Sequence, residues 1–194
     1  MDFRRIRLKL NTMKNSLPVI LICLCPFIGL SQNHTKATQS HENHSGEFKK
    51  HRVALEFGYV HVPDAYEEEP GDQSVFIPSI GIEYLYRFNH KWGAALTANM
   101  ETGNYLIEFN REDLARENVA IIAAVAVFEI MPHWGVFTGP GIEIEKHHNF
   151  FVWRVGTDYQ VPLGNNWDIT PVFSFDHKDA YTSWELMISI GKQF

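Results

Sequence analysis

The sequence predicts an all-β protein, an eight-stranded antiparallel up-and-down transmembrane β-barrel that follows a cleaved signal peptide and a disordered leader. Three observations predict it. The chain starts with an export signal. Apolar and polar residues then alternate with period two in nearly every segment from residue 53 to residue 194. The polar face of this alternation is also the face that carries the glycines.

Residues 1–31 are predicted to be the signal peptide. "MDFRRIRLKLNTMKN" carries five basic residues, and an apolar run over 17–30 ends in small residues suitable for cleavage. A membrane anchor is the alternative, but about 14 apolar residues broken by Pro18 and Pro26 are short for a span of roughly 20. Met13 is a second possible start.

The net charge and the cysteine content exclude some classes of partner and a disulfide-stabilised fold. Cys23 and Cys25 both lie in the signal, so the mature chain has no disulfide framework. Cleavage leaves 12 basic and 22 acidic residues, a formal net charge of −10. This balance argues against a nucleic-acid partner and against anchoring through anionic head groups.

Residues 32–50, "QNHTKATQSHENHSGEFKK", form the predicted leader. They contain one large apolar residue, Phe48, and are expected to be disordered. Three histidines lie in the leader and His51 follows it. A metal-scavenging arm is one interpretation, but nothing fixes a ligand geometry, and a polar linker is favoured.

The barrel is predicted over residues 51–194 from eight alternating segments of about the length that crosses a bilayer when tilted. They are residues 53–62, 75–88, 92–101, 118–131, 134–145, 151–161, 167–176 and 184–194. Segment 119–130 is apolar on both faces, and "REDLAREN" before it is compatible with the start of a helix. We predict a strand with Ala120, Ala124 and Ala126 on the small-residue face.

The composition of the two faces indicates which one is outside. Glycine weakens a strand unless another group approaches closely, and a narrow barrel interior supplies that crowding. The opposite face is large and aromatic, as lipid contact requires. Only helices and closed barrels satisfy every backbone group in a bilayer, so the last strand is expected to pair with the first.

Connection lengths alternate between short and long. Residues 89–91, 132–133 and 163–166 form short turns, whereas 63–74 and 102–118 are long. Short periplasmic turns and longer outer loops are typical of outer-membrane barrels. We therefore expect Glu68 and Asp113 to face the cell exterior and Asn89, His133 and Asn165 to face the periplasm.

These features resemble the small eight-stranded outer-membrane β-barrel proteins of Gram-negative bacteria. The resemblance covers residues 51–194 and includes "GPGIEIE" and the closing "ISIGKQF". It implies outer-membrane localisation, outer-membrane lipids as surroundings, and a signal read by the barrel-assembly machinery at Ile188, Ile190 and Phe194. Lys192, on the apolar face, departs from the pattern.

An eight-stranded barrel is just wide enough to be filled by side chains. We predict a plug, formed by a lumen network of Glu56, Glu83, Arg87, Glu101, Glu143, Arg154, Asp158 and Asp168. Each arginine needs a carboxylate, because an unpaired buried charge costs several kcal/mol. We expect Arg154 to pair with acids such as Glu143. No metal or cofactor is predicted.

The predicted function is a non-enzymatic barrel with a structural or surface-contact role, and a possible extracellular ligand bound through the outer loops. One alternative is a soluble lipocalin-like barrel that binds an apolar ligand. Another is a lipid A-modifying enzyme similar to the deacylases, using His177, Ser183 and Glu185, although the His-x-Ser spacing of that family is absent. A metal at Glu145 with the adjacent His147 and His148 needs a turn, and the acidic residues 67–69 are predicted to be a solvated loop.

Overall fold

The computed structural model describes residues 48–63, 65–66 and 74–194. The predicted signal peptide, the leader up to residue 47 and the acidic run 67–69 lie outside the described residues. Residues Gly46–Phe194 form one compact unit. Within the described part of the chain, no helix is long and apolar enough to span a membrane.

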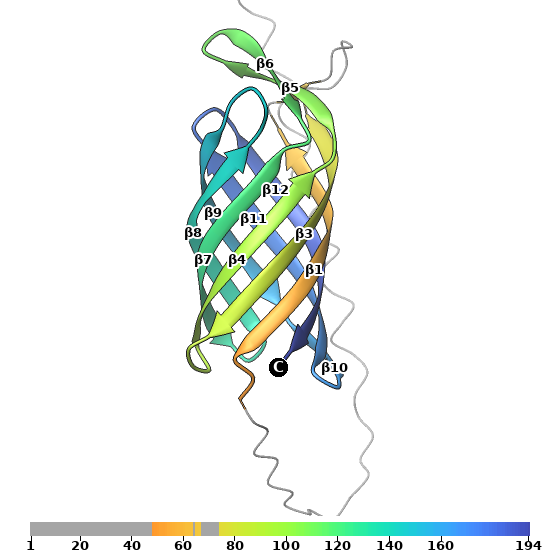
Figure 1. The fold of residues 1–194 in the computed structure, drawn as a ribbon, viewed down its shortest axis with the longest axis vertical. Coiled ribbons are helices and arrows are strands. Elements are labelled where there is room, and N and C mark those ends of the chain that lie inside the picture. Colours follow the sequence, from red (N-terminus) through yellow and green to blue (C-terminus); the bar gives the residue numbers. More distant parts are fainter. Residues whose placement is uncertain (1–47, 64, 67–73) are drawn as a thin grey trace, which may run out of the picture. The chain divides into compact units, whose positions relative to one another are not determined.

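Eight long strands form a closed antiparallel barrel (Figure 1). Each strand pairs with the next long strand along the chain, and the last pairs with the first, so the predicted up-and-down fold is confirmed. The strands are β1 (His51–Val62), β3 (Val75–Arg87), β4 (Trp92–Glu101), β7 (Ala120–Met131), β8 (Trp134–Ile144), β9 (Phe150–Tyr159), β11 (Trp167–Lys178) and β12 (Thr182–Gln193). A short strand, β10 (Val161–Gly164), extends the pairing of β11.

The pairing of β12 with β1 explains why alternation continues to residue 194. The register runs from His61 opposite Trp184 to Arg52 opposite Gln193. Beyond it, the Phe194 amide donates to the carbonyl of His51 at 2.9 Å, and the His51 amide donates to the carbonyl of Phe194 at 3.1 Å. No backbone edge is left open along this seam.

The apolar face of the strands points outward and the polar, small face points inward. Leu55 and Leu186 are 51% and 65% exposed, whereas Glu56 on the inward face is 4% exposed. Exposed aromatic residues lie near the strand ends, as at membrane interfaces. The ammonium of Lys192 lies 5.3 Å from the ring centroid of Trp167, so this cation is accommodated against an aromatic side chain.

Segment 119–130 is the strand β7, but its predicted phase is wrong. Ala124 and Ala126 lie on the outward face, and Ile121, Ala123 and Val125 are the buried, inward residues. The register with β4 gives the reason, since Ala124 pairs with the outward Leu96 and cross-strand partners share a face. The small side chains here face outward.

Two-residue turns connect strands at the end of the barrel that carries Phe194, which we call the turn end. Asn165 and Asn166 both have positive φ, at 52° and 64°, as a type I′ hairpin requires. Pro132 and His133 (φ 70°) connect β7 to β8. Proline followed by a residue of positive φ fits a type II turn.

The opposite end, which we call the loop end, carries a small second sheet. Residues 102–118, predicted as a loop or the start of a helix, instead contain the hairpin of β5 (Asn104–Phe109) and β6 (Glu112–Glu117). The two-residue strand β2 (Ala65–Tyr66) pairs with β5. The hairpin projects beyond the barrel strands (Figure 1).

Candidate functional site: the charged barrel interior

The predicted lumen residues all lie in the inward phase of their strands. Glu101 and Glu143 are fully buried, and Asp168, Arg154 and Glu56 are 1–4% exposed, whereas Glu83, Arg87 and Asp158 are half-buried. They do not form one network. The structure divides them among three clusters along the barrel.

The middle cluster centres on Arg154. Its guanidinium donates two hydrogen bonds to Asp176, from Nε at 2.8 Å and Nη2 at 2.7 Å, and one to Glu185 at 2.9 Å. Nη1 donates to Asn99 at 2.8 Å, and the amide of Asn99 donates to Glu56 at 3.0 Å. A buried arginine thus has a bidentate partner and a second carboxylate.

The expected pairing of Arg154 with Glu143 is wrong. In the β8–β9 register, Arg154 lies opposite Gly139, whereas Glu143 lies opposite Phe150. That offset of four residues corresponds to about 13 Å along a strand. Asp176 is instead the direct partner of Arg154 in the β9–β11 register.

The turn-end cluster centres on Arg52. Its guanidinium forms ion pairs with Asp168 and Glu83, each at 2.5 Å, and also contacts Thr170 and Ser189. Arg52 is not among the predicted lumen residues because the predicted first strand begins at Val53. Extending the alternation back by one residue would have found it.

Arg87, also at the turn end, lacks the carboxylate partner expected for it. Its Nη2 donates to the side-chain oxygen of Gln160 at 2.8 Å. Among the described residues it forms no ion pair, and its Nη1 is buried with no hydrogen-bond partner.

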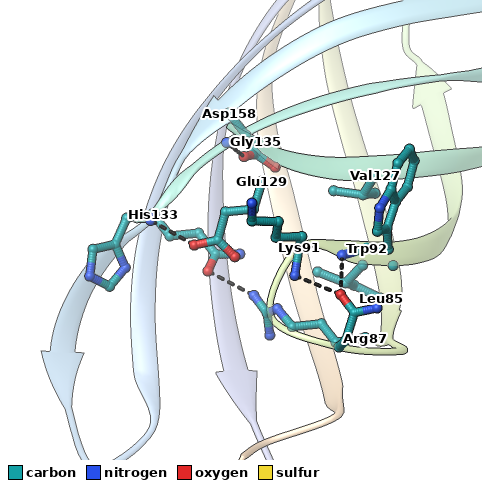
Figure 2. Close-up of a pocket in the computed structure, with 12 residues that line it drawn as sticks. Leu85, Arg87, Lys91, Trp92, Val127, Glu129, His133, Gly135 and Asp158 are labelled. Atoms are coloured by element: carbon teal, nitrogen blue, oxygen red, sulfur yellow. Dashed lines mark hydrogen bonds between the residues drawn. The ribbon is translucent and has the colours of Figure 1, made fainter. Parts of the chain in front are cut away.

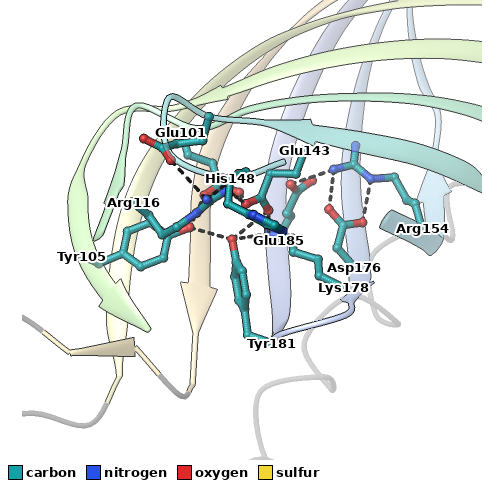
Figure 3. Close-up of polar contacts among 11 residues, drawn as sticks. Glu101, Tyr105, Arg116, Glu143, His148, Arg154, Asp176, Lys178, Tyr181 and Glu185 are labelled. Carbon is teal, nitrogen blue, oxygen red and sulfur yellow. Dashed lines mark hydrogen bonds and ion pairs between the residues drawn. The ribbon is translucent and has the colours of Figure 1, made fainter. Parts of the chain in front are cut away.

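The loop-end cluster centres on Glu143 (Figure 3). Its carboxylate forms ion pairs with Arg116 and, at 2.7 Å, with Lys178, and it accepts a hydrogen bond from the Tyr181 hydroxyl at 2.7 Å. Tyr105 contacts both Tyr181 and Glu101. Lys178 was missed because the predicted seventh strand ended at Asp176, although it continues the inward phase by one step.

Arg116 comes from the β5–β6 hairpin and is fully buried. Besides Glu143, it contacts Glu145 at 3.2 Å and donates to the backbone carbonyl of His148 at 2.7 Å. Its guanidinium lies 5.0 Å from the ring centroid of Phe150. Arg116 lies in the long connection predicted over residues 102–118, and no local signal in the sequence marks it as an anchor of a hairpin.

Two loop residues of this cluster have shifted pKa values. Burial, and then the charges of Glu143 and Glu101, raise the pKa of Tyr181 well above its ordinary value, so its hydroxyl stays a donor. Burial alone would raise the pKa of Glu145. The backbone N–H of His147 and the guanidinium of Arg116 outweigh it and hold the pKa of Glu145 below its usual range.

An apolar core also fills the loop end. It combines inward residues of the barrel strands with Ala65 of β2, Tyr105 and Ile107 of β5, and Tyr181. These last four residues are each at most 4% exposed. The second sheet therefore packs into the barrel mouth.

The structure does not bring together the residues considered for a deacylase-like enzyme or for a metal site. His177 is exposed on the outward phase of β11, whereas Ser183 and Glu185 are buried inside, and Glu185 is paired with Arg154. Glu145 accepts the backbone N–H of His147 and pairs with Arg116. In the described ranges, no group of three or more His, Cys, Asp or Glu side chains is placed to hold a metal.

No protein-family model and no curated protein matches the sequence. Solved structures do match. The outer membrane protein OprG from Pseudomonas aeruginosa has a TM-score of 0.52 at 12% identity, over 75% of this chain and 97% of that chain. Neisserial surface protein A has a TM-score of 0.51 at 13% identity, over 74% and 97%. Ail, the attachment invasion locus protein of Yersinia pestis, has 0.47 at 14% identity, over 76% and 100%.

The matches to OprG and to Neisserial surface protein A show the fold and leave activity open. The exterior supplies a separate observation, because an apolar barrel surface around a charged interior suits lipid and is the inverse of a soluble barrel for apolar ligands. The chain therefore has the fold of the small eight-stranded outer-membrane β-barrels, with an exterior suited to lipid.

Proposed function

We propose that this protein is a non-enzymatic outer-membrane barrel that conducts no solutes, supports the envelope and contacts the surroundings through its loop end. The ion-pair cluster of Arg154, Asp176 and Glu185 is the observation that carries the proposal. All three side chains are at most 3% exposed and come from the adjacent strands β9, β11 and β12, and Arg154 also reaches across the lumen to Asn99 of β4.

The loop end supports the same proposal. Arg116 and the apolar core fix the hairpin to the barrel, so the hairpin presents a surface of defined conformation. Its outer part carries the exposed acids Glu108, Glu112 and Asp113. An extracellular ligand of opposite charge is the kind of contact this surface favours.

The insertion route is also a proposal. Ile188, Ile190 and Phe194 are 40–55% exposed on the outward face of β12, where lipid would cover them in the folded protein. We propose that the barrel-assembly machinery reads these residues before the barrel closes.

Planar-bilayer recording of the refolded protein tests the closed lumen. We expect no steady conductance from the wild type, and none from a variant whose hairpin tip, residues 108–113, is replaced by glycine and serine, because the Arg154 cluster remains. A stable ohmic conductance of the wild type would contradict the proposal. Heat-modifiable migration on a detergent gel confirms that each sample is folded.

A further inference from the structure

The turn end contains a cavity that the lumen plug does not use. Its volume is about 460 Å³. Arg87, Gln160 and Gln193 line it on the lumen side, and Ile130 and Met131 line it at the barrel rim. A smaller cavity of about 30 Å³, roughly the volume of one water molecule, shares Arg87 and Gln160 with it (Figure 2).

Basic side chains outnumber acidic ones in the wall of the larger cavity. Arg87, His90, Lys91 and His133 contribute to its wall, and the acidic side chain there is Glu129. The carboxylate of Glu129 already accepts the backbone N–H of His133 at 2.9 Å. The wall of this cavity therefore has a charge opposite to the net −10 of the predicted mature chain. The negative net charge disfavours a general attraction of anions to the protein, but it leaves room for a local basic site.

Arg87 contributes to this wall a guanidinium that has no ion-pair partner among the described residues. It donates to Gln160, forms no ion pair with any described residue, and has a buried Nη1 without a partner. Figure 2 shows its guanidinium between the turn that carries Lys91 and the turn that carries His133. Arg87 and Lys91 both line the cavity. A guanidinium and an ammonium group in one wall suit the negative charge of a phosphate, and the planar guanidinium also suits its geometry.

The rim of the cavity is apolar and faces the membrane. Ile130 and Met131 are each 50% exposed, and Trp92 and Trp134 flank them among the exposed aromatic residues. A ligand that fits both parts needs an anionic head and an apolar body. A free anion would leave the apolar rim unused.

We propose that the turn-end cavity binds the phosphate group of an anionic phospholipid. Arg87 and Lys91 donate to the phosphate oxygens, and the acyl chains lie along Ile130 and Met131 on the outside of the barrel. Basic pockets at a membrane interface bind lipid head groups in the same way. The site is independent of whether the lumen conducts.

Native mass spectrometry of the refolded protein in detergent tests the site. The probes are phosphatidylglycerol, phosphatidylcholine with the same acyl chains, and inorganic phosphate. We expect the wild type to retain phosphatidylglycerol at least tenfold better than phosphatidylcholine, and the Arg87→Gln/Lys91→Gln variant to lose that preference. Arg111→Gln/Lys146→Gln removes the same charge from exposed positions at the loop end and should behave as wild type.

Two results would overturn the proposal. One is an unchanged preference for phosphatidylglycerol in folded Arg87→Gln/Lys91→Gln protein. The other is inorganic phosphate that displaces the lipid at equimolar concentration, which would assign the cavity to a free anion. If the double variant does not show heat-modifiable migration, Lys91→Gln alone, in an exposed turn, provides the same comparison with Lys146→Gln.

Discussion

At the scale of single residues, the interior depends on a few buried cations, each of which pairs with acids from other parts of the barrel. Arg52, Arg154, Arg116 and Lys178 are each at most 2% exposed, and each has two carboxylate partners. Breaking such a pair leaves an uncompensated charge inside the barrel.

Arg154→Met should destabilise the barrel by about 3–5 kcal/mol, because Asp176 and Glu185 lose their shared partner. Urea unfolding in lipid vesicles at pH 7 measures the change. Arg111→Met, which removes the same group from the exposed hairpin turn, serves as the control and should change stability little. Equal unfolding midpoints for both variants would contradict the paired assignment.

The lowered pKa of Glu145 at the loop end predicts that the stability of the protein depends on pH. Because its folded pKa lies below its usual range, its stabilising contribution is present above that range and is lost as the pH falls through the folded pKa. The wild type should therefore exceed Glu145→Gln in stability at pH 7, and the difference should shrink as the pH is lowered below the usual range of a glutamate. A difference that is constant with pH would show that the carboxylate charge is not responsible.

At the scale of elements, the long strands could be predicted because each carries its own period-two signal. The β5–β6 hairpin could not, because its strand "EDLARE" is mostly polar and its buried residues, Tyr105, Ile107 and Arg116, are divided between two strands. The phase of β7 was mispredicted because both of its faces are apolar and only the register with β4 fixes it. The clusters were mispredicted for the same reason, since partners such as Asp176 for Arg154 are set by register between strands.

The orientation of the elements is testable on intact cells. We expect a cysteine at Asp113, in the hairpin, to react with an impermeant thiol reagent, and a cysteine at Asn165, in the β10–β11 turn, to be protected. The long connections end at one side of the barrel and the short turns at the other, and short turns face the periplasm in outer-membrane barrels. Labelling of Asn165→Cys with protection of Asp113→Cys would reverse the orientation.

At the scale of the whole molecule, the pairing of β1 with β12 closes the barrel, so that the polar face of the alternating strands lies inside and the apolar face lies outside. The alternation could be read from the sequence, and the pattern of faces predicted lipid outside. The apolar core at the loop end and the cavity at the turn end could not be predicted from the sequence, because each combines residues from strands that are distant in the chain.

Deleting Phe194 should reduce insertion in cells much more than stability after refolding. The side chain is 55% exposed on the outer surface, so its loss removes only part of the roughly 1.5–3 kcal/mol of a fully buried phenylalanine. If the assembly machinery reads Phe194 in the unfolded chain, as we propose, no other residue replaces that signal. Membrane yield at matched expression and urea unfolding of refolded protein measure the two effects, and equal membrane yields would contradict the assembly role.

The central claim is that the apolar face of the barrel lies in lipid, and spin labels along β12 test it most directly. Single cysteines at Leu186, Met187, Ile188, Ser189 and Ile190 are labelled, and collisions with oxygen and with a water-soluble nickel complex are measured in vesicles. We predict high oxygen accessibility at Leu186, Ile188 and Ile190, and low accessibility to both reagents at Met187 and Ser189. High accessibility to the nickel complex at Leu186, Ile188 and Ile190 would contradict the account.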